Sequence, residues 1–291
     1  MEIAVASGKG GTGKTTVAVN LALVASRSGW RACYLDCDVE EPNGHLFLHP
    51  RIDTSRPVGI PVPEVDMAKC NACGKCARIC AYSAITCIGG KVLVFPELCH
   101  GCGGCALVCP QKAITEKARQ IGVVEVGEVA DLDFVQGRLR VGEAMSPPLI
   151  REVKVERPNG ADHTVSILDA PPGTSCPVIT AVSGAEFVLL VTEPTPFGLN
   201  DLELALEMVR ELGLHHAVVV NRHQEGNDSA RVFCREQGVD IAAEIPDDRR
   251  VAEAYSRGAA AVNAVPGYES IFLRLWDTVR EATVDGRIPK R

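Results

Sequence analysis

The sequence of 291 residues predicts an α/β fold with a mostly parallel sheet flanked by helices, interrupted by a small α+β insertion. Three observations predict it. A glycine-rich loop, "SGKGGTGKTT", follows the apolar run that opens the chain and precedes an amphipathic stretch. Apolar runs and amphipathic stretches alternate again in the second half, which is typical of βα units and a parallel sheet. Between these halves lies a short cysteine-rich segment that is repeated once.

The elements on either side of the cysteine-rich segment follow from apolar periodicity. On the N-terminal side we expect a strand over 3–7, a helix over 15–28 and a strand over 31–38. On the C-terminal side we expect strands in "VSILDAPPG", "FVLLVTEP", "HAVVVNR" and "DIAAEIP", and a helix in "LNDLELALEMVRELG". Region 121–155 suggests two strands and a helix near "PPLIREVKV". The last apolar face, in "ESIFLRLWDTVREAT", is expected to dock on the core instead of a membrane.

Composition excludes several classes of function. The net charge is -7 and the basic residues are scattered, so we expect no nucleic-acid partner. No apolar run is long enough to cross a bilayer and no signal peptide opens the chain, so we expect a cytoplasmic protein without an integral membrane segment. Thirteen cysteines in such a reducing compartment favour metal ligation over disulfides.

Eight of these cysteines belong to an internal repeat. "CNACGKCARICAYSAIT" (70–86) aligns with "CHGCGGCALVCPQKAIT" (99–115) at an offset of 29, with nine of seventeen positions identical. Gly89 and Gly90 mark a hairpin between the halves. We therefore expect the nucleotide-binding domain in two parts, 1–60 and 117–291, around an inserted domain at 61–116. The proline-rich stretch "RPVGIPVPEV" is interpreted as the connection into the insertion.

Each half of the repeat has the spacing C-x2-C-x2-C-x3-C, which resembles the bacterial ferredoxins that hold two [4Fe–4S] clusters. In that pattern the fourth cysteine of each half ligates the other cluster. The resemblance implies that cluster one is held by Cys70, Cys73, Cys76 and Cys109, and cluster two by Cys99, Cys102, Cys105 and Cys80. Zinc is the alternative, but structural zinc sites usually pair separate CxxC units, whereas each loop here offers three ligands. Cys176, seven residues after Asp169, is interpreted as a buried or redox-idle thiol, and a ligand of a cluster that bridges two subunits is the weaker alternative.

The glycine-rich loop predicts a phosphate site. "GKGGTGKT" fits G-x-x-x-x-G-K-[ST] between a strand and a helix, so its backbone amides are expected to cradle the phosphates of ATP. Lys14 is expected to reach the β- and γ-phosphates, and the Thr15 hydroxyl to ligate Mg²⁺. The expected nucleotide-binding residues of the loop are Gly8, Gly10, Gly11, Thr12, Gly13, Lys14, Thr15 and Thr16.

Lys9, in "KGGTGKT", makes the loop resemble the deviant Walker A loop of the MinD/ParA family of P-loop ATPases. The resemblance implies a homodimer that sandwiches ATP, in which Lys9 reaches the nucleotide of the partner subunit. It also implies that Asp38 orients the attacking water, with Asp36 the weaker candidate, and that Asp169 holds Mg²⁺. By the same resemblance Asn221 is a candidate for binding adenine, helped by the loop "IPDD".

Three functions remain open for a Mg-dependent ATPase with two clusters. The first, narrowly preferred, is ATP-gated electron transfer to or from an unidentified redox partner. The second is delivery of iron–sulfur clusters to an apo-acceptor, against which stands the absence of a CxxC outside the repeat. The third is a spatial or cell-division regulator of the MinD/ParA type with redox sensing.

Overall fold

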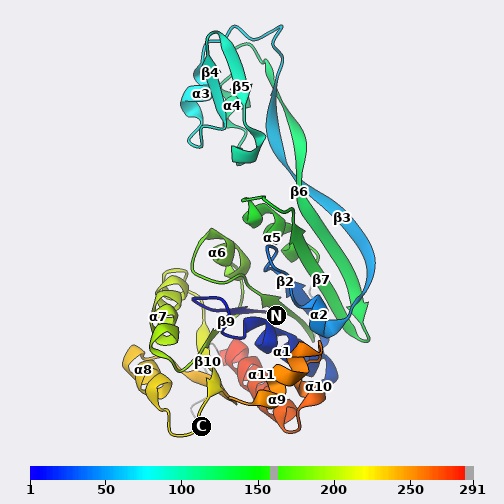
Figure 1. The fold of residues 1–291 in the computed structure, drawn as a ribbon, viewed down its shortest axis with the longest axis vertical. Helices are drawn as coiled ribbons and strands as arrows, with labels where there is room; N and C mark the ends of the chain where they lie inside the picture. Colours follow the sequence, from blue (N-terminus) through cyan, green and yellow to red (C-terminus); the bar gives the residue numbers. More distant parts are fainter. Residues whose placement is uncertain (158–162, 286–291) are drawn as a thin grey trace.

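The computed structural model describes residues 1–157 and 163–285 and contains, within these ranges, one nine-stranded sheet and a separate hairpin (Figure 1). The order in the large sheet is β11-β10-β9-β1-β8-β2-β7-β6-β3. Its strands are β1 (Glu2–Ala6), β2 (Arg31–Asp36), β3 (Arg51–Val65), β6 (Ile114–Val129), β7 (Leu132–Leu139), β8 (Thr164–Asp169), β9 (Phe187–Thr192), β10 (His216–His223) and β11 (Ile241–Pro246). All strands from β11 to β7 are parallel, whereas β6 is antiparallel to both of its neighbours.

Helices cover both faces of this sheet. The helices are α1 (Lys14–Arg27), α2 (His45–Leu48), α3 (Lys75–Ile79), α4 (Gly104–Leu107), α5 (Ser146–Val155), α6 (Cys176–Val182), α7 (Pro196–Glu211), α8 (Ser229–Gln237), α9 (Arg249–Ser256), α10 (Ala261–Ala264) and α11 (Tyr268–Asp285), with a 3₁₀ turn at Pro96–Leu98. Alternate residues of the buried strands face opposite layers, so Ile3 and Val5 pack with α1 and α11 while Ala4 packs with α5 to α8. None of the helices in the described ranges is long and apolar enough to cross a bilayer.

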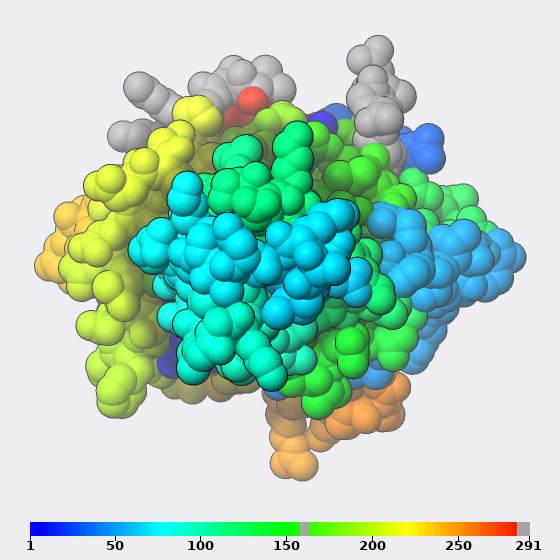
Figure 2. All heavy atoms as spheres, turned by 90° about the horizontal axis from the view of Figure 1, so that it is seen from above, coloured from blue at the N-terminus to red at the C-terminus, as the bar shows by residue number. Residues whose placement is uncertain are grey.

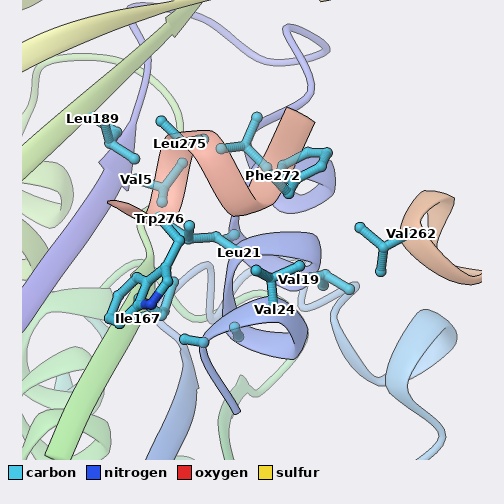
Figure 3. Close-up of a cluster of buried hydrophobic side chains, with 14 of the residues drawn as sticks. Val5, Val19, Leu21, Val24, Ile167, Leu189, Val262, Phe272, Leu275 and Trp276 are labelled. Carbon is cyan, nitrogen blue, oxygen red and sulfur yellow. The ribbon is translucent and has the colours of Figure 1, made fainter. Parts of the chain in front are cut away.

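The C-terminal helix α11 docks on the core, as its apolar periodicity predicts. Leu275, Trp276 and Val279 are buried, and Figure 3 places Leu275 and Phe272 beside side chains of α1. The helix thereby covers one face of the central strands. Its apolar stripe is used in packing within the chain.

The long strands β3 and β6 form an antiparallel ribbon that crosses both predicted domain boundaries (Figure 1). The proline-rich stretch leads into the module, as interpreted, but it does so as part of the strand β3, which the sequence did not predict. Proline has no N–H to donate, but β3 is the edge strand of the sheet, where one side of the backbone needs no partner. Pro57, Pro61 and Pro63 are therefore accommodated without breaking the pairing with β6.

The cysteine module, residues 61–116, has an internal pseudo-twofold symmetry that follows the repeat. Its predicted hairpin forms as β4 (Ile85–Ile88) and β5 (Lys91–Val94). The pairing of Ile85 with Val94 corresponds, at the offset of 29, to that of Ile114 with Val65. Positive φ angles repeat at the same offset, at Ala72 and Gly101, Gly74 and Gly103, and Ser83 and Lys112. The duplication in the sequence is therefore a duplication in structure.

The ribbon places the module beyond the carboxyl ends of the parallel strands of the sheet. Because β3 runs in the same direction as β7, its end at Val65 lies beyond the carboxyl ends of β1, β2 and β8. One apolar cluster continues from the sheet through Ile121 and Ile60 to Cys99 in the module. The residues outside the module, 1–60 and 117–291, are called the body. In Figure 1 the module stands clear of the body at one end of the ribbon, and Figure 2, seen from above, shows it in front of the body.

Candidate functional site

The glycine-rich loop connects β1 to α1 and is held by a side chain from β10. Gly13 adopts φ +94 immediately before α1 begins at Lys14. The Asn221 side chain donates from Nδ2 to the carbonyl oxygen of Thr12 at 2.8 Å, and a Cβ added at Gly13 would lie 2.2 Å from the same nitrogen. Glycine is therefore required here both for the backbone conformation and for the close approach of Asn221.

A large pocket opens beside this loop, with about 1500 Å³ of empty space that includes open solvent. Among the predicted residues it is lined by Gly10, Gly11, Gly13, Lys14, Thr15, Thr16, Asp38 and Asn221. The far wall is formed by residues 245–248 and the side chains of Val251, Tyr255 and Tyr268. The loop "IPDD" thus lies at the pocket, as predicted, and the apolar and aromatic wall offers a surface for a nucleotide base. Tyr255 and Tyr268 were not singled out by the sequence.

Gly8, Lys9 and Thr12 lie outside the lining of this pocket. Gly8 packs against α7, where an added Cβ would be 2.0 Å from the carbonyl oxygen of Asp201. The Lys9 ammonium lies 3.9 Å from the Asp201 carboxylate, and both side chains are partly exposed. In this single chain Lys9 therefore points away from the pocket of its own subunit and toward α7.

Three carboxylates meet at the carboxyl ends of β2 and β8. Asp36 is fully buried and accepts from the backbone amides of Gly44 (2.9 Å) and Asp38 (3.2 Å), so it orders the segment after β2. Asp38 itself lines the pocket, and burial together with the negative charge of Asp169 raises its pKa to about 7. The structure thus separates the two candidates: Asp36 is bound to the backbone, whereas Asp38 faces the pocket.

Asp169 is buried at the end of β8, beside the phosphate loop. Its Oδ2 accepts from the Tyr34 hydroxyl at 2.9 Å, whereas its Oδ1 is buried with no hydrogen-bond partner among the described residues. Burial raises the pKa of Asp169, and the neighbouring Thr15 hydroxyl, Lys14 and Tyr34 oppose the rise. Burial also lowers the pKa of Lys14, which Asp169 and Asp38 counteract. A free buried carboxylate oxygen next to the Thr15 hydroxyl suits a hard cation such as Mg²⁺.

The cysteines of the repeat surround the interior of the module. A second pocket is lined by Cys70, Cys73, Cys76 and Cys109, which is the ligand set predicted for cluster one. Backbone amides donate to four of the eight sulfurs at 3.3–3.4 Å, in pairs related by the repeat: Ala72 to Cys70 and Gly101 to Cys99, then Ala84 to Cys80 and Ala113 to Cys109. Within the described residues, no three His, Cys, Asp or Glu side chains form a group placed to hold a metal ion.

A chain of contacts joins the nucleotide pocket to the ribbon below the module. The Leu139 amide donates to the carbonyl oxygen of Val39, next to Asp38, at 2.8 Å. The following residue, Arg140, donates from its backbone to Ile121 of β6, also at 2.8 Å. A few residues later Glu143, which is almost fully buried, forms an ion pair with Arg119 of β6. Sequence patterns did not predict this connection, because its partners are far apart in the chain.

The five cysteines outside the repeat differ in their exposure. Cys33, Cys37 and Cys234 are buried, Cys87 is half-buried, and Cys176 is exposed at the start of α6. Burial raises the pKa of Cys37 and Cys234, to about 11 for the latter, as expected for unreactive thiols.

Comparisons with known proteins agree with this geometry. The model of the CobQ/CobB/MinD/ParA nucleotide binding domain matches residues 3–262. An uncharacterised protein of Methanocaldococcus jannaschii is 30% identical over 259 residues, which cover 89% of this chain and 90% of that protein. An iron-sulfur cluster carrier protein of Pyrococcus abyssi is 23% identical, covering 90% of this chain and 79% of the carrier.

Among solved structures, the septum site-determining protein MinD complexed with Mg-ADP, from Pyrococcus horikoshii, is similar in fold. Its TM-score is 0.59 at 19% sequence identity, and the match covers 98% of each chain. This likeness confirms the predicted α/β fold with a mostly parallel sheet flanked by helices.

Proposed function

Because the chain belongs to the CobQ/CobB/MinD/ParA nucleotide-binding domain family, we propose that it is a cytoplasmic, Mg-dependent ATPase that couples nucleotide-driven dimerisation to electron transfer through two [4Fe–4S] clusters. The observation that carries the coupling is the chain of contacts from Asp38 to the ribbon of the cysteine module. The redox partner is a protein that exchanges single electrons with the clusters.

At the nucleotide end, each side chain is given one task. Lys14 and the loop amides bind the phosphates, and Thr15 with the free Oδ1 of Asp169 holds Mg²⁺. Asp38 orients the attacking water, which its position on the pocket wall supports. Lys9 leaves Asp201 and acts on the nucleotide of the partner subunit. Magnesium supplies charge neutralisation at the transferred phosphoryl group.

At the cysteine end, the fit of the residues to two clusters is supported by chemistry and symmetry. Thiolates are the ligands that iron–sulfur clusters take, and hydrogen bonds to their sulfurs tune cluster potentials. The four repeat-related amide-to-sulfur contacts are of this kind. Cys109 lines one pocket with three cysteines of the first half, Cys70, Cys73 and Cys76, which supports the crosswise ligand set for cluster one.

Coupling between the two ends is supported by the hydrogen bonds and the ion pair that join them. Asp38 and Val39 follow β2 directly, and Val39 is bonded to the end of β7. The β7–α5 loop then holds β6 through Arg140 and the Glu143–Arg119 pair. A shift of Asp38 on ATP binding is therefore expected to move the ribbon, and with it the module.

Variants of the cluster ligands test the metal part of the proposal. The purified protein should contain eight irons, and Cys109→Ser should lower this to about four. Combining Cys109→Ser with Cys70→Ser should cost no further iron, because both hold cluster one, whereas combining it with Cys99→Ser should remove nearly all iron. The reverse pattern would refute the crosswise assignment.

A Lys14→Ala variant tests the nucleotide part. It should abolish ATP hydrolysis while iron loading stays at the wild-type level, since Lys14 lies in the nucleotide pocket and not in the module. Loss of iron in this variant would contradict the separation of the chain into two working parts.

Delivery of clusters to an apo-acceptor is the second candidate, favoured by the name of the Pyrococcus relative. An assay that mixes the loaded protein with an apo-ferredoxin distinguishes it from electron transfer. Electron transfer predicts that the eight irons stay with the chain through ATP turnover. Stoichiometric appearance of iron in the acceptor would instead support delivery.

A further inference from the structure

Tyr34 places a hydroxyl group inside the apolar layer on one face of the central strands. Its side chain in β2 is fully buried, and its ring stacks on the Phe134 ring of β7 with centroids 5.8 Å apart. A buried hydroxyl without a hydrogen bond is unfavourable, so a tyrosine at this position needs a specific acceptor. The acceptor is Asp169, whose Oδ2 lies 2.9 Å from the Tyr34 hydroxyl oxygen. The hydroxyl is thus bonded to a carboxylate beside the phosphate loop.

The pairing of β2 with β8 explains how Tyr34 reaches this carboxylate. In the parallel pair Asp36 lies opposite Asp169, whereas Tyr34 lies opposite Ile167, two residues before the end of each strand. Residues two apart on a strand share a face of the sheet and are separated by roughly 6–7 Å. A serine or threonine hydroxyl at position 34 would be too short to cover this distance, whereas the phenol ring covers it.

A glycine in the segment after β2 makes room for the ring. Gly44 has φ -57 and ψ -37, a conformation open to every L residue, so its backbone does not require glycine. A Cβ added there would lie 2.6 Å from Cζ of Tyr34. The Gly44 amide also donates to the Asp36 carboxylate at 2.9 Å, which keeps this segment against the end of β2. Close packing on Gly44 and stacking on Phe134 therefore hold the ring where it reaches Asp169.

The hydrogen bond from Tyr34 makes the two oxygens of the Asp169 carboxylate unequal. An ionised carboxylate only accepts hydrogen bonds, and the torsion that turns it has two broad, equivalent orientations. Tyr34 occupies Oδ2, whereas Oδ1 is buried and has no hydrogen-bond partner among the described residues. The Thr15 hydroxyl neighbours the same carboxylate. One oxygen is therefore held by the protein, and the other is left, in a buried position, for a ligand.

We propose that Tyr34 is a positioning residue of the magnesium site, whose hydroxyl fixes the orientation of the Asp169 carboxylate so that Oδ1 remains available to the cation. The inference rests on the magnesium site proposed above. Groups that donate hydrogen bonds to metal ligands orient them, and their loss typically lowers metal affinity by about 10- to 100-fold. Tyr34 lies outside the lining of the nucleotide pocket, so its substitution should weaken only the metal-dependent part of nucleotide binding.

Titration calorimetry with ADP, in the presence and absence of Mg²⁺, tests this role on the full chain. Tyr34→Phe removes only the hydroxyl oxygen and keeps the ring. We expect this variant to bind Mg-ADP at least about tenfold more weakly than wild type, with the Mg-free affinity for ADP within about twofold. Thr192→Val is the matched control, since it removes another buried hydroxyl, which donates at 2.9 Å to the Gly198 carbonyl oxygen.

The outcomes of this experiment separate the inference from the proposed function. Wild-type affinity for Mg-ADP in Tyr34→Phe would overturn the inference. An equal loss in Thr192→Val would overturn it too, because the loss would then follow from any missing buried hydrogen bond. If Mg²⁺ does not strengthen ADP binding in the wild-type chain, the proposed magnesium site itself is refuted.

The EPR signal of free Mn²⁺, which is lost when the ion is bound, gives a second measurement that needs no turnover. Mn²⁺ takes the same oxygen ligands as Mg²⁺, so it is titrated into the ADP-bound chain. The dissociation constant of Mn²⁺ should rise at least about tenfold in Tyr34→Phe and stay at the wild-type value in Thr192→Val. Wild-type Mn²⁺ affinity in Tyr34→Phe would show that Asp169 keeps its orientation without the hydroxyl, which refutes the inference.

Discussion

Substitution of Asn221 distinguishes two roles of this side chain in the nucleotide pocket. The sequence suggested a contact with adenine, whereas in the structure the side chain donates a hydrogen bond to the phosphate loop. Its Nδ2 donates to the Thr12 carbonyl oxygen at 2.8 Å in a buried position. Asn221→Ala would leave that carbonyl without its partner, at a cost of about 1–3 kcal/mol. If the whole cost falls on the loop conformation that binds nucleotide, the affinity for nucleotide drops by a factor of roughly 5 to 150.

Titration calorimetry with Mg-ATP and Mg-GTP checks this reasoning. The loop contacts phosphates, so both nucleotides should lose affinity by the same factor and the preference for one base should persist. Asn227→Ala is the matched control, since this asparagine makes a similar bond, to the Pro194 carbonyl oxygen, on the surface of the body. A selective loss of ATP affinity, with GTP binding unchanged, would refute the loop-holding role and support the adenine contact.

Three further perturbations follow from the charges near the pocket and the ribbon. In the nucleotide-free protein the pKa of Asp38 is raised to about 7, so Asp38 keeps a proton that the unfolded chain loses at about pH 4. The free energy of unfolding should therefore fall as the pH rises from about 4 to about 7. Denaturant titrations should find a smaller pH dependence of this free energy in Asp38→Asn. Burial would raise the pKa of Glu143, but Arg119 and backbone amides leave this pKa lowered. Because its removal leaves a buried charge without a partner, Glu143→Ala should destabilise the protein by about 3 kcal/mol in urea unfolding. A cost below about 1 kcal/mol would contradict a buried ion pair. Asp201→Ala should lower the free energy of unfolding by less than about 1 kcal/mol, because the contact of Asp201 with Lys9 is partly exposed. Lys9→Ala should abolish ATP-dependent dimerisation, measured by light scattering, whereas Asp201→Ala should not. Equal effects of the two variants on dimerisation would argue against a role of Lys9 across the dimer.

Local patterns predicted the elements that depend on short stretches of sequence. The alternation of apolar runs identified the parallel strands, and the glycines and Lys14 identified the phosphate loop, because each signal lies within about ten residues. The repeat at an offset of 29 predicted the hairpin and the symmetry of the module. These features require no knowledge of distant contacts.

Features that depend on pairing between distant segments were missed. The ribbon was not predicted because three prolines in β3 read as a connection, and only its position at the sheet edge makes them acceptable. The Glu143–Arg119 pair and the bond from Asn221 to Thr12 link residues 24 and 209 positions apart, which no local pattern reports. The difference between Asp36 and Asp38 likewise appeared only once their partners were known.

The central claim is that nucleotide binding changes the reduction potential of the clusters through the contacts between the pocket and the ribbon. A redox titration followed by EPR, on the eight-iron protein with and without a non-hydrolysable Mg-ATP analogue, measures this most directly. The account predicts that the analogue shifts the midpoint potential of at least one cluster by on the order of 60 mV, a tenfold change in a one-electron equilibrium. Breaking the ribbon contact with Glu143→Ala should reduce that shift. If the potentials and EPR spectra of the wild-type protein are the same with and without the analogue, this result would contradict the coupling.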